Sequence, residues 1–184
     1  SMTIIHPLWP GGPSEQDLKR GHKLIQQAQK RQNTTAREKL YIDTTYAYFN
    51  DTEKANRKGR LSRFETAWEV VTKQYPKDTE AKAFYALSMI ATANKADTSF
   101  FKQQQAAEIA KSVLKINPNH PGAHHYIIHA FDLPGLAKNA TQYADNYGKM
   151  TPKVPHASHM LSHIYTRLGD WEKSIVWNTT SSDT

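Results

Sequence analysis

Apolar side chains recur at intervals of three or four residues along most of the chain. After Leu61, the positions that share this spacing are Phe64, Ala67, Trp68, Val71 and Tyr75. Such spacing places apolar side chains on one face of a helix, and the proline at position 76 should end that helix. Phe84, Leu87 and Ile90 follow at three-residue intervals. Alternation with a period of two, which is typical of strands, is scarce, so the sequence predicts an all-α protein.

Polar residues mark several expected helix starts. Thr35 and Ser62 are each followed three residues later by glutamate, which is the pattern of a capping box. Either Asp78 or Thr79 can cap the next helix. In the N-terminal third, residues 14–50 look like a helical hairpin.

Prolines divide the rest of the chain into similar segments. Pro76, Pro118 and Pro152 each precede an expected helix start, and the last two are 34 residues apart (152 − 118). The first interval is 42 residues (118 − 76), and the 8 extra residues fit a loop at 94–99. Small residues recur five positions after each proline and where paired helices should cross: Ala81, Ala123 and Ala157, then Ala106, Ala140 and Ser174. The chain therefore contains an internal repeat of about two helices per unit.

A 34-residue period of paired helices with small residues at their crossing resembles the tetratricopeptide repeat. The turn Leu168-Gly169-Asp170-Trp171 fits this pattern, because Gly169 can end one helix and Asp170 can cap the next. The resemblance implies a superhelix of antiparallel helix pairs. The expected organisation is an N-terminal extension at 1–13, a single repeat domain at 14–178 with its clearest units at 76–117, 118–151 and 152–178, and a C-terminal tail at 179–184. A repeat array without a closing helix exposes its last surface, so we expect a homo-oligomer formed through the C-terminal end.

Composition narrows the possible chemistry. The chain has 184 residues, a formal net charge of +7 and no cysteine, which excludes disulfides, thiolate catalysis and cysteine-ligated metals. It has no apolar run long enough to cross a membrane, and residues 1–13 lack the pattern of a signal peptide, so we expect a soluble protein with no membrane partner.

Five basic side chains crowd one segment: Lys54, Arg57, Lys58, Arg60 and Arg63. No nucleic-acid-binding motif accompanies them, so we interpret them as a solvated connection between helices and expect no nucleic-acid partner.

The histidines have the most informative spacing. His125 and His129 stand seven and eleven residues after one repeat proline, and His159 and His163 stand at the same positions of the next repeat. Each i, i+4 pair lies on one helical face, and the first helices of adjacent repeats should lie side by side. The four imidazoles are therefore predicted to hold a divalent metal, with zinc most favoured and copper, iron or nickel also suited to imidazole. The alternative is that they form a polar layer or bind a peptide.

Other polar residues near these pairs could assist the metal. His120 and His156 lie beside prolines at expected helix starts, where each can cap its helix or orient a ligand. Asp132 and Glu80 are candidate catalytic carboxylates, as base, extra ligand or orienting group, although each also suits a helix end. With a metal-bound water, this set predicts a metal-dependent hydrolase of small esters or amides. The alternative is a non-enzymatic scaffold that binds a peptide in the repeat groove.

Two longer motifs strengthen the resemblance. Residues 120–132 read HPGAHHYIIHAFD and residues 155–169 read PHASHMLSHIYTRLG. They are similar to the motifs HPGxxHYxIHAxD and PHAxHMPSHIxTRLG of a bacterial group of tetratricopeptide-containing proteins, except that Leu161 replaces a proline. The resemblance implies a superhelical repeat fold and supports the histidine site, but it implies no particular reaction.

Overall fold

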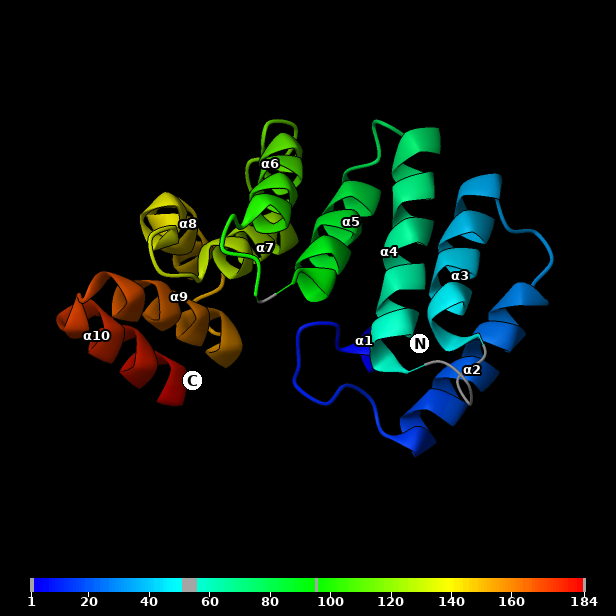
Figure 1. Ribbon diagram of the computed structural model, residues 1–184, viewed down its shortest axis with the longest axis horizontal. Coiled ribbons are helices and arrows are strands. Elements are labelled where there is room, and N and C mark those ends of the chain that lie inside the picture. The colour runs from blue at the N-terminus through cyan, green and yellow to red at the C-terminus, as the bar shows by residue number, and fades with distance from the viewer. Residues whose placement is uncertain (1, 51–55, 95, 184) are drawn as a thin grey trace. The chain divides into compact units, whose positions relative to one another are not determined.

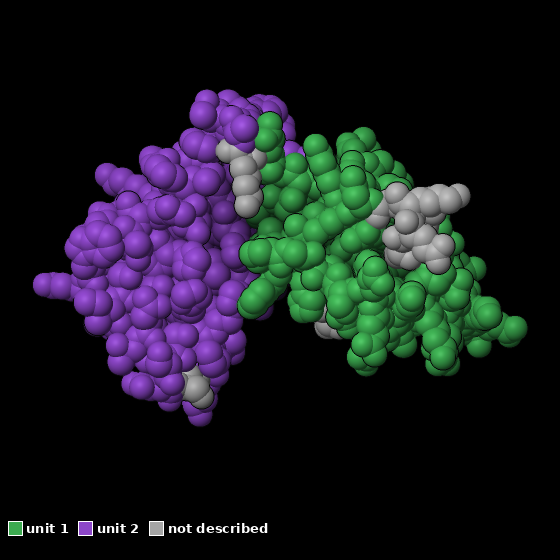
Figure 2. Space-filling model, turned by 60° about the horizontal axis from the view of Figure 1, so that its bottom comes forward, with its two compact units in different colours: residues 1–94 green, residues 95–184 purple. Residues whose placement is uncertain are grey.

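The computed structural model describes residues 2–50, 56–94 and 96–183. Every regular element in these three ranges is a helix, which confirms the predicted all-α class. Contacts divide the chain into two compact units, residues 1–94 and residues 95–184, which Figure 2 shows in different colours. The boundary falls within the predicted loop at 94–99. The single domain predicted at 14–178 stays a prediction.

Unit 1 is a series of adjacent helices, labelled in Figure 1: α1 (Met2–Ile5), α2 (Glu15–Gln29), α3 (Ala36–Phe49), α4 (Arg57–Gln74) and α5 (Thr79–Thr92). Each of α2, α3 and α4 contacts the next helix along the chain. The predicted apolar face of α4 is buried, and Trp68 lies at its centre with no exposed surface. Its indole stacks on Phe84 at 5.0 Å and meets Tyr41 edge-on at 4.9 Å. Aromatic contacts of this kind join α3, α4 and α5 into one core.

The helix starts of unit 1 test the predicted caps. The box at Thr35 is confirmed, because its hydroxyl and the Glu38 carboxylate cap each other's backbone amides. Asp78, rather than Thr79, caps α5. The box predicted at Ser62 is wrong, because α4 begins at Arg57 and leaves Ser62 inside the helix. The side chain of residue 56, an asparagine, accepts a hydrogen bond from the amide of residue 59 at 2.9 Å, so a competent cap already stands further upstream.

The basic segment makes internal contacts. Lys54 lies outside the described residues. Arg57 donates hydrogen bonds of 3.0 and 2.6 Å to two carbonyls of the segment before α2. Arg63 reaches two carbonyls near the end of α3 at 3.1 and 2.6 Å, and the guanidinium of Arg60 lies over the Tyr48 ring. These arginines therefore connect α4 to the chain before it, and the interpretation as a merely solvated segment is wrong.

Unit 2 contains α6 (Phe101–Leu114), α7 (Pro121–Phe131), the 3₁₀ helix η1 (Ala137–Ala140), α8 (Thr141–Met150), α9 (Pro155–Leu168) and α10 (Trp171–Ser182). The small residues at repeat positions lie where the helices pack: Ala106, Ala123, Ala140 and Ala157 are fully buried and Ser174 nearly so. Gly169 ends α9 with a positive φ of 74°, and Asp170 caps α10, as predicted. The predicted unit at 76–117 is divided, because it contributes α5 to unit 1 and α6 to unit 2.

Two features of unit 2 bear directly on function. The helices α7 and α9, which carry the two histidine pairs, contact each other as the repeat pattern predicts. The helix α10 continues to Ser182, into the predicted tail, and it presents Trp171, Ile175 and Val176 to solvent. Within the described part of the chain, no helix combines the length and apolar character needed to cross a membrane.

Candidate metal site

The site is built by the first turns and inner faces of α7 and α9. Proline at the first position starts each helix, at Pro121 and Pro155, because its fixed φ suits a helix and its missing amide needs no partner there. The position of each helix start determines which face of the helix the following histidines occupy. His125 and His129 come from α7, and the side chain of His156 comes from the first turn of α9.

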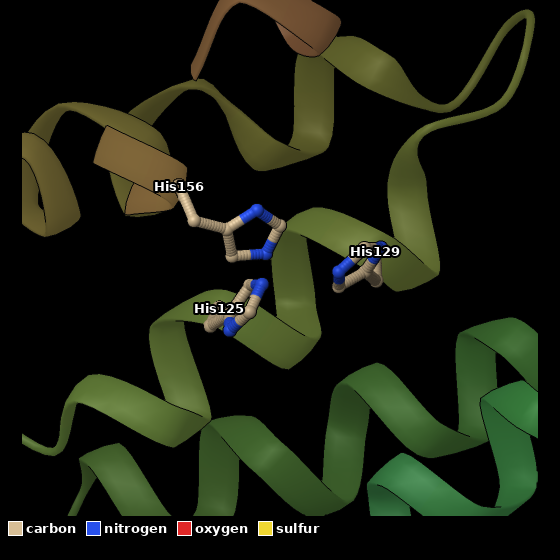
Figure 3. Close-up of side chains that lie close together, drawn as sticks. All are labelled: His125, His129 and His156. Atoms are coloured by element: carbon tan, nitrogen blue, oxygen red, sulfur yellow. The ribbon is translucent and has the colours of Figure 1, made fainter. Parts of the chain in front are cut away.

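Three imidazoles converge between the two helices. His125, His129 and His156 each offer a ring nitrogen, and these nitrogens all lie within 4.8 Å of one another. Figure 3 shows the three rings facing a common space. The ring centroids of His125 lie 4.7 Å from His129 and 5.1 Å from His156. Nitrogens bound to one tetrahedral zinc are about 3.3 Å apart, a separation that lies within this limit.

The surroundings keep these imidazoles neutral at physiological pH. Burial is the main cause that lowers the pKa of His125 to about 3, and the nearby His129 and His156 lower it further. Burial also lowers the pKa of His129 to about 4, and it lowers that of His156. The buried Nε2 of His125 has no hydrogen-bond partner among the described residues. Neutral rings with an unpartnered nitrogen are the chemical state that a transition metal requires.

The other predicted ligand pair lies beside this triad. The Nε2 atoms of His159 and His163 face each other at 2.9 Å. The Nδ1 atom of His163 lies 2.9 Å from the carboxylate of Asp132, and the Nδ1 atom of His159 lies 3.1 Å from the side-chain oxygen of Asn178. The four predicted ligands thus form two groups. His125 and His129 of α7 lie with His156, and His159 and His163 of α9 lie with each other.

Asp132 has the geometry of an orienting carboxylate. One oxygen accepts from His163, and the other accepts from Arg167 Nε at 2.8 Å. Burial raises the pKa of Asp132, but the hydrogen bonds from His163 and Arg167 outweigh burial and hold the pKa below its usual value. A carboxylate that is ionised and doubly bonded is a weak base but a good anchor for a ligand ring. Glu80 belongs to unit 1, so its part in this site stays a prediction.

Two neighbouring histidines have structural contacts. His120 is buried and caps α7, accepting the Ala123 amide at its Nδ1 at 3.1 Å. This is one of the two roles expected for it. His124 points to a different face from His125, and its Nε2 lies 2.9 Å from the carbonyl of Pro118.

Three residues of the site escaped the sequence analysis. Tyr147 of α8 stacks on the His125 ring at 5.3 Å with an angle of 14° between the planes. Arg167 holds Asp132, and Asn178 of α10 contacts His159. Arg167 had a signal, because it follows His163 by one helical turn. The other two come from different helices, and no spacing in the sequence connects them to the histidines.

Comparison with known proteins supports the fold. No protein-family model matches the chain, and no curated protein matches it. A solved structure named MamA MSR-1 C2, a tetratricopeptide-like protein, superposes with a TM-score of 0.59 at 12% identity and covers 90% of this chain and 86% of its own. The chain has a tetratricopeptide-like fold. At 12% identity the likeness extends to the fold alone. A tetratricopeptide-like repeat explains why small residues recur in this chain where its helices cross.

Proposed function

We propose that this tetratricopeptide-like protein binds a divalent transition metal through His125, His129 and His156. The observation that supports this most is the convergence of three imidazole nitrogens within 4.8 Å, and the Nε2 of His125 is in addition buried and without a partner among the described residues. Imidazole suits zinc, copper, iron and nickel, and zinc is favoured because three histidines with one open position form a common zinc site. His156 replaces the more distant α9 histidines in the ligand set predicted from sequence.

The activity we propose for this site is hydrolysis of small esters or amides. A metal held by three protein ligands supplies a water of lowered pKa and an electrophile for a carbonyl oxygen. Asp132 would serve as a positioning residue for His163, since both of its oxygens already accept hydrogen bonds. Glu80 remains a candidate base from unit 1.

The alternative is a scaffold that binds a peptide and performs no chemistry. Helical repeats commonly bind extended segments, and the net charge of +7 favours an acidic one. Self-association is a related proposal: Trp171 and Ile175 of α10 are 63% and 65% exposed, and an apolar pair of this size favours burial against a second copy. Light scattering would detect such an oligomer, and Trp171→Ser with Ile175→Ser should make it a monomer.

Metal analysis separates the two functions. Protein purified without a nickel column should contain stoichiometric metal, and His125→Ala with His156→Ala should remove the ion bound by the triad. His22→Ala in α2 is the matched control, because this histidine lies in unit 1 and should leave the metal content unchanged. Hydrolase assays with and without a chelator would follow. If reconstituted protein holds no metal, the metalloprotein proposal fails and the peptide-binding alternative takes its place.

A further inference from the structure

The histidine pair of α9 has two ring nitrogens that face each other. His163 Nδ1 faces an ionised carboxylate, which can only accept, so this nitrogen carries a proton, and in the neutral ring Nε2 has the lone pair. His159 Nδ1 faces the Asn178 oxygen, which also lies 3.0 Å from the Ser162 hydroxyl. With the amide in this orientation, His159 also donates from Nδ1 and keeps its lone pair on Nε2.

The two lone pairs then point at each other. The Nε2 atoms of His159 and His163 are only 2.9 Å apart, and their rings are perpendicular with centroids 4.6 Å apart. Two neutral rings in these tautomers repel at this distance, and either a proton shared between the Nε2 atoms or a metal ion bound by both relieves the repulsion. A transition-metal ion bound by both nitrogens removes this repulsion, and a slight opening of the pair gives the separation of about 3.3 Å that zinc requires.

We propose that His159 and His163 hold a second divalent metal ion, which makes the cluster a two-metal centre. This inference rests on the proposed function, because the first ion is the one assigned to His125, His129 and His156. The two positions adjoin, since His156, His159 and His163 follow one another at three- and four-residue spacing on a single face of α9. His159 is exposed and His163 is half-buried, so the second position is open to solvent.

The surroundings of the pair are built to orient ligands. Asp132 fixes the ring of His163, Arg167 fixes Asp132, and Asn178 of α10 fixes the ring of His159. A carboxylate behind a histidine is the usual second partner of a metal ligand, because it sets the tautomer and makes the ring a stronger donor. Two protein ligands leave several positions free, so the second ion could take an oxygen atom of an ester or amide substrate that also contacts the first ion.

Zinc stoichiometry tests the proposal. Metal-free protein titrated with Zn²⁺ against a chromophoric chelator should bind two equivalents. His159→Gln should bind one equivalent, and because residue 159 is exposed the substitution should leave the fold intact. His163→Gln is a second variant with the same expected result. His22→Ala should still bind two equivalents. Circular dichroism of each variant checks that its helices are intact.

The outcomes separate this proposal from the metal site on which it rests. Suppose that the wild type binds one equivalent, that His125→Ala removes it and that His159→Gln does not. This result would overturn the second position alone. Two equivalents that His159→Gln does not change would also overturn it, because the second ion would lie elsewhere. No binding at all would overturn both proposals. Copper adds a spectroscopic measure: Cu²⁺-loaded wild type should give a magnetically coupled electron paramagnetic resonance signal, and His159→Gln should give that of isolated ions.

Discussion

Replacing His125 with phenylalanine should abolish metal binding at the triad of His125, His129 and His156 without destabilising the metal-free protein. The substitution keeps a flat ring in the space where the imidazole stacks on Tyr147 at 5.3 Å. It removes the Nε2 atom, which is buried and has no partner among the described residues. Most substitutions of a half-buried residue in a packed core lower stability, so unchanged stability of the metal-free variant would be an unusual result that tests the reasoning.

The expected magnitude follows from these contacts. A buried polar atom without a hydrogen bond costs about 1–3 kcal/mol, and phenylalanine removes that cost. The larger ring must fit beside His129 and His156, and overpacking of this kind costs about 1–3 kcal/mol where the site is fully enclosed. Because His125 is only partly buried, the second cost should be at the low end. The free energy of unfolding of the metal-free protein should therefore stay the same or rise by up to about 2 kcal/mol.

His120→Ala is the matched control on the same helix. Its imidazole caps α7 through the Ala123 amide, so its loss should lower the free energy of unfolding by about 0.5–2 kcal/mol while the zinc stoichiometry is unchanged. Urea denaturation with and without zinc measures both quantities for both variants. The reasoning would be refuted if His125→Phe lowered the stability of the metal-free protein as much as His120→Ala does, or if it gained as much stability from zinc as the wild type does.

Three further substitutions test other contacts. Asp132→Asn should weaken zinc binding at His163 by about 10–100-fold, because the charged orienting group is lost, and a competition titration measures this. Gly21→Ala should lower the free energy of unfolding by about 1–2 kcal/mol, because the new Cβ would lie 2.2 Å from Cε1 of the buried Phe49. Alanine is the better helix former, so a variant as stable as the wild type or more stable would contradict that packing. Burial raises the pKa of Asp78, but hydrogen bonds from an arginine, an amide and a tyrosine outweigh it and hold the pKa low. Stability should therefore fall as the pH drops below about 4, and Asp78→Asn, which keeps a capping side chain, should reduce this loss in acid denaturation.

The sequence predicted the all-α repeat fold, whereas the four-histidine ligand set stays a prediction. Helical spacing and the positions of proline and small residues are local properties, and the buried Ala123 and Ala157 at equivalent places in α7 and α9 confirm the repeat derived from them. The predicted helix start at Ser62 was wrong because two residues near it can each cap a helix. The asparagine at position 56 comes first along the chain, and it caps α4. Local patterns of this kind identify the helix but leave its first residue uncertain.

The ligand set depends on how two helices meet, which spacing alone cannot give. The repeat register placed His125 and His159 at equivalent positions, yet the structure brings His156 to His125 instead. A shift of about one turn between α7 and α9 is enough to exchange these partners, because one turn advances a helix by 5.4 Å. Contacts from other helices, such as that of Tyr147, arise only when the chain is folded.

The repeat itself supports the proposal that these histidines serve more than folding. In α5, the positions equivalent to His125 and His129 are Ala83 and Leu87, which are 2% and 8% exposed and pack as ordinary apolar residues. Burying a leucine side chain at such a place stabilises a protein by about 1.5–3 kcal/mol. Imidazoles at the same register in α7 give up that apolar contact, and their buried nitrogen is left without a partner. A position that a neighbouring repeat fills with apolar side chains here holds several neutral imidazoles, and this difference supports the proposed metal ion, because imidazole nitrogens are good ligands for transition metals.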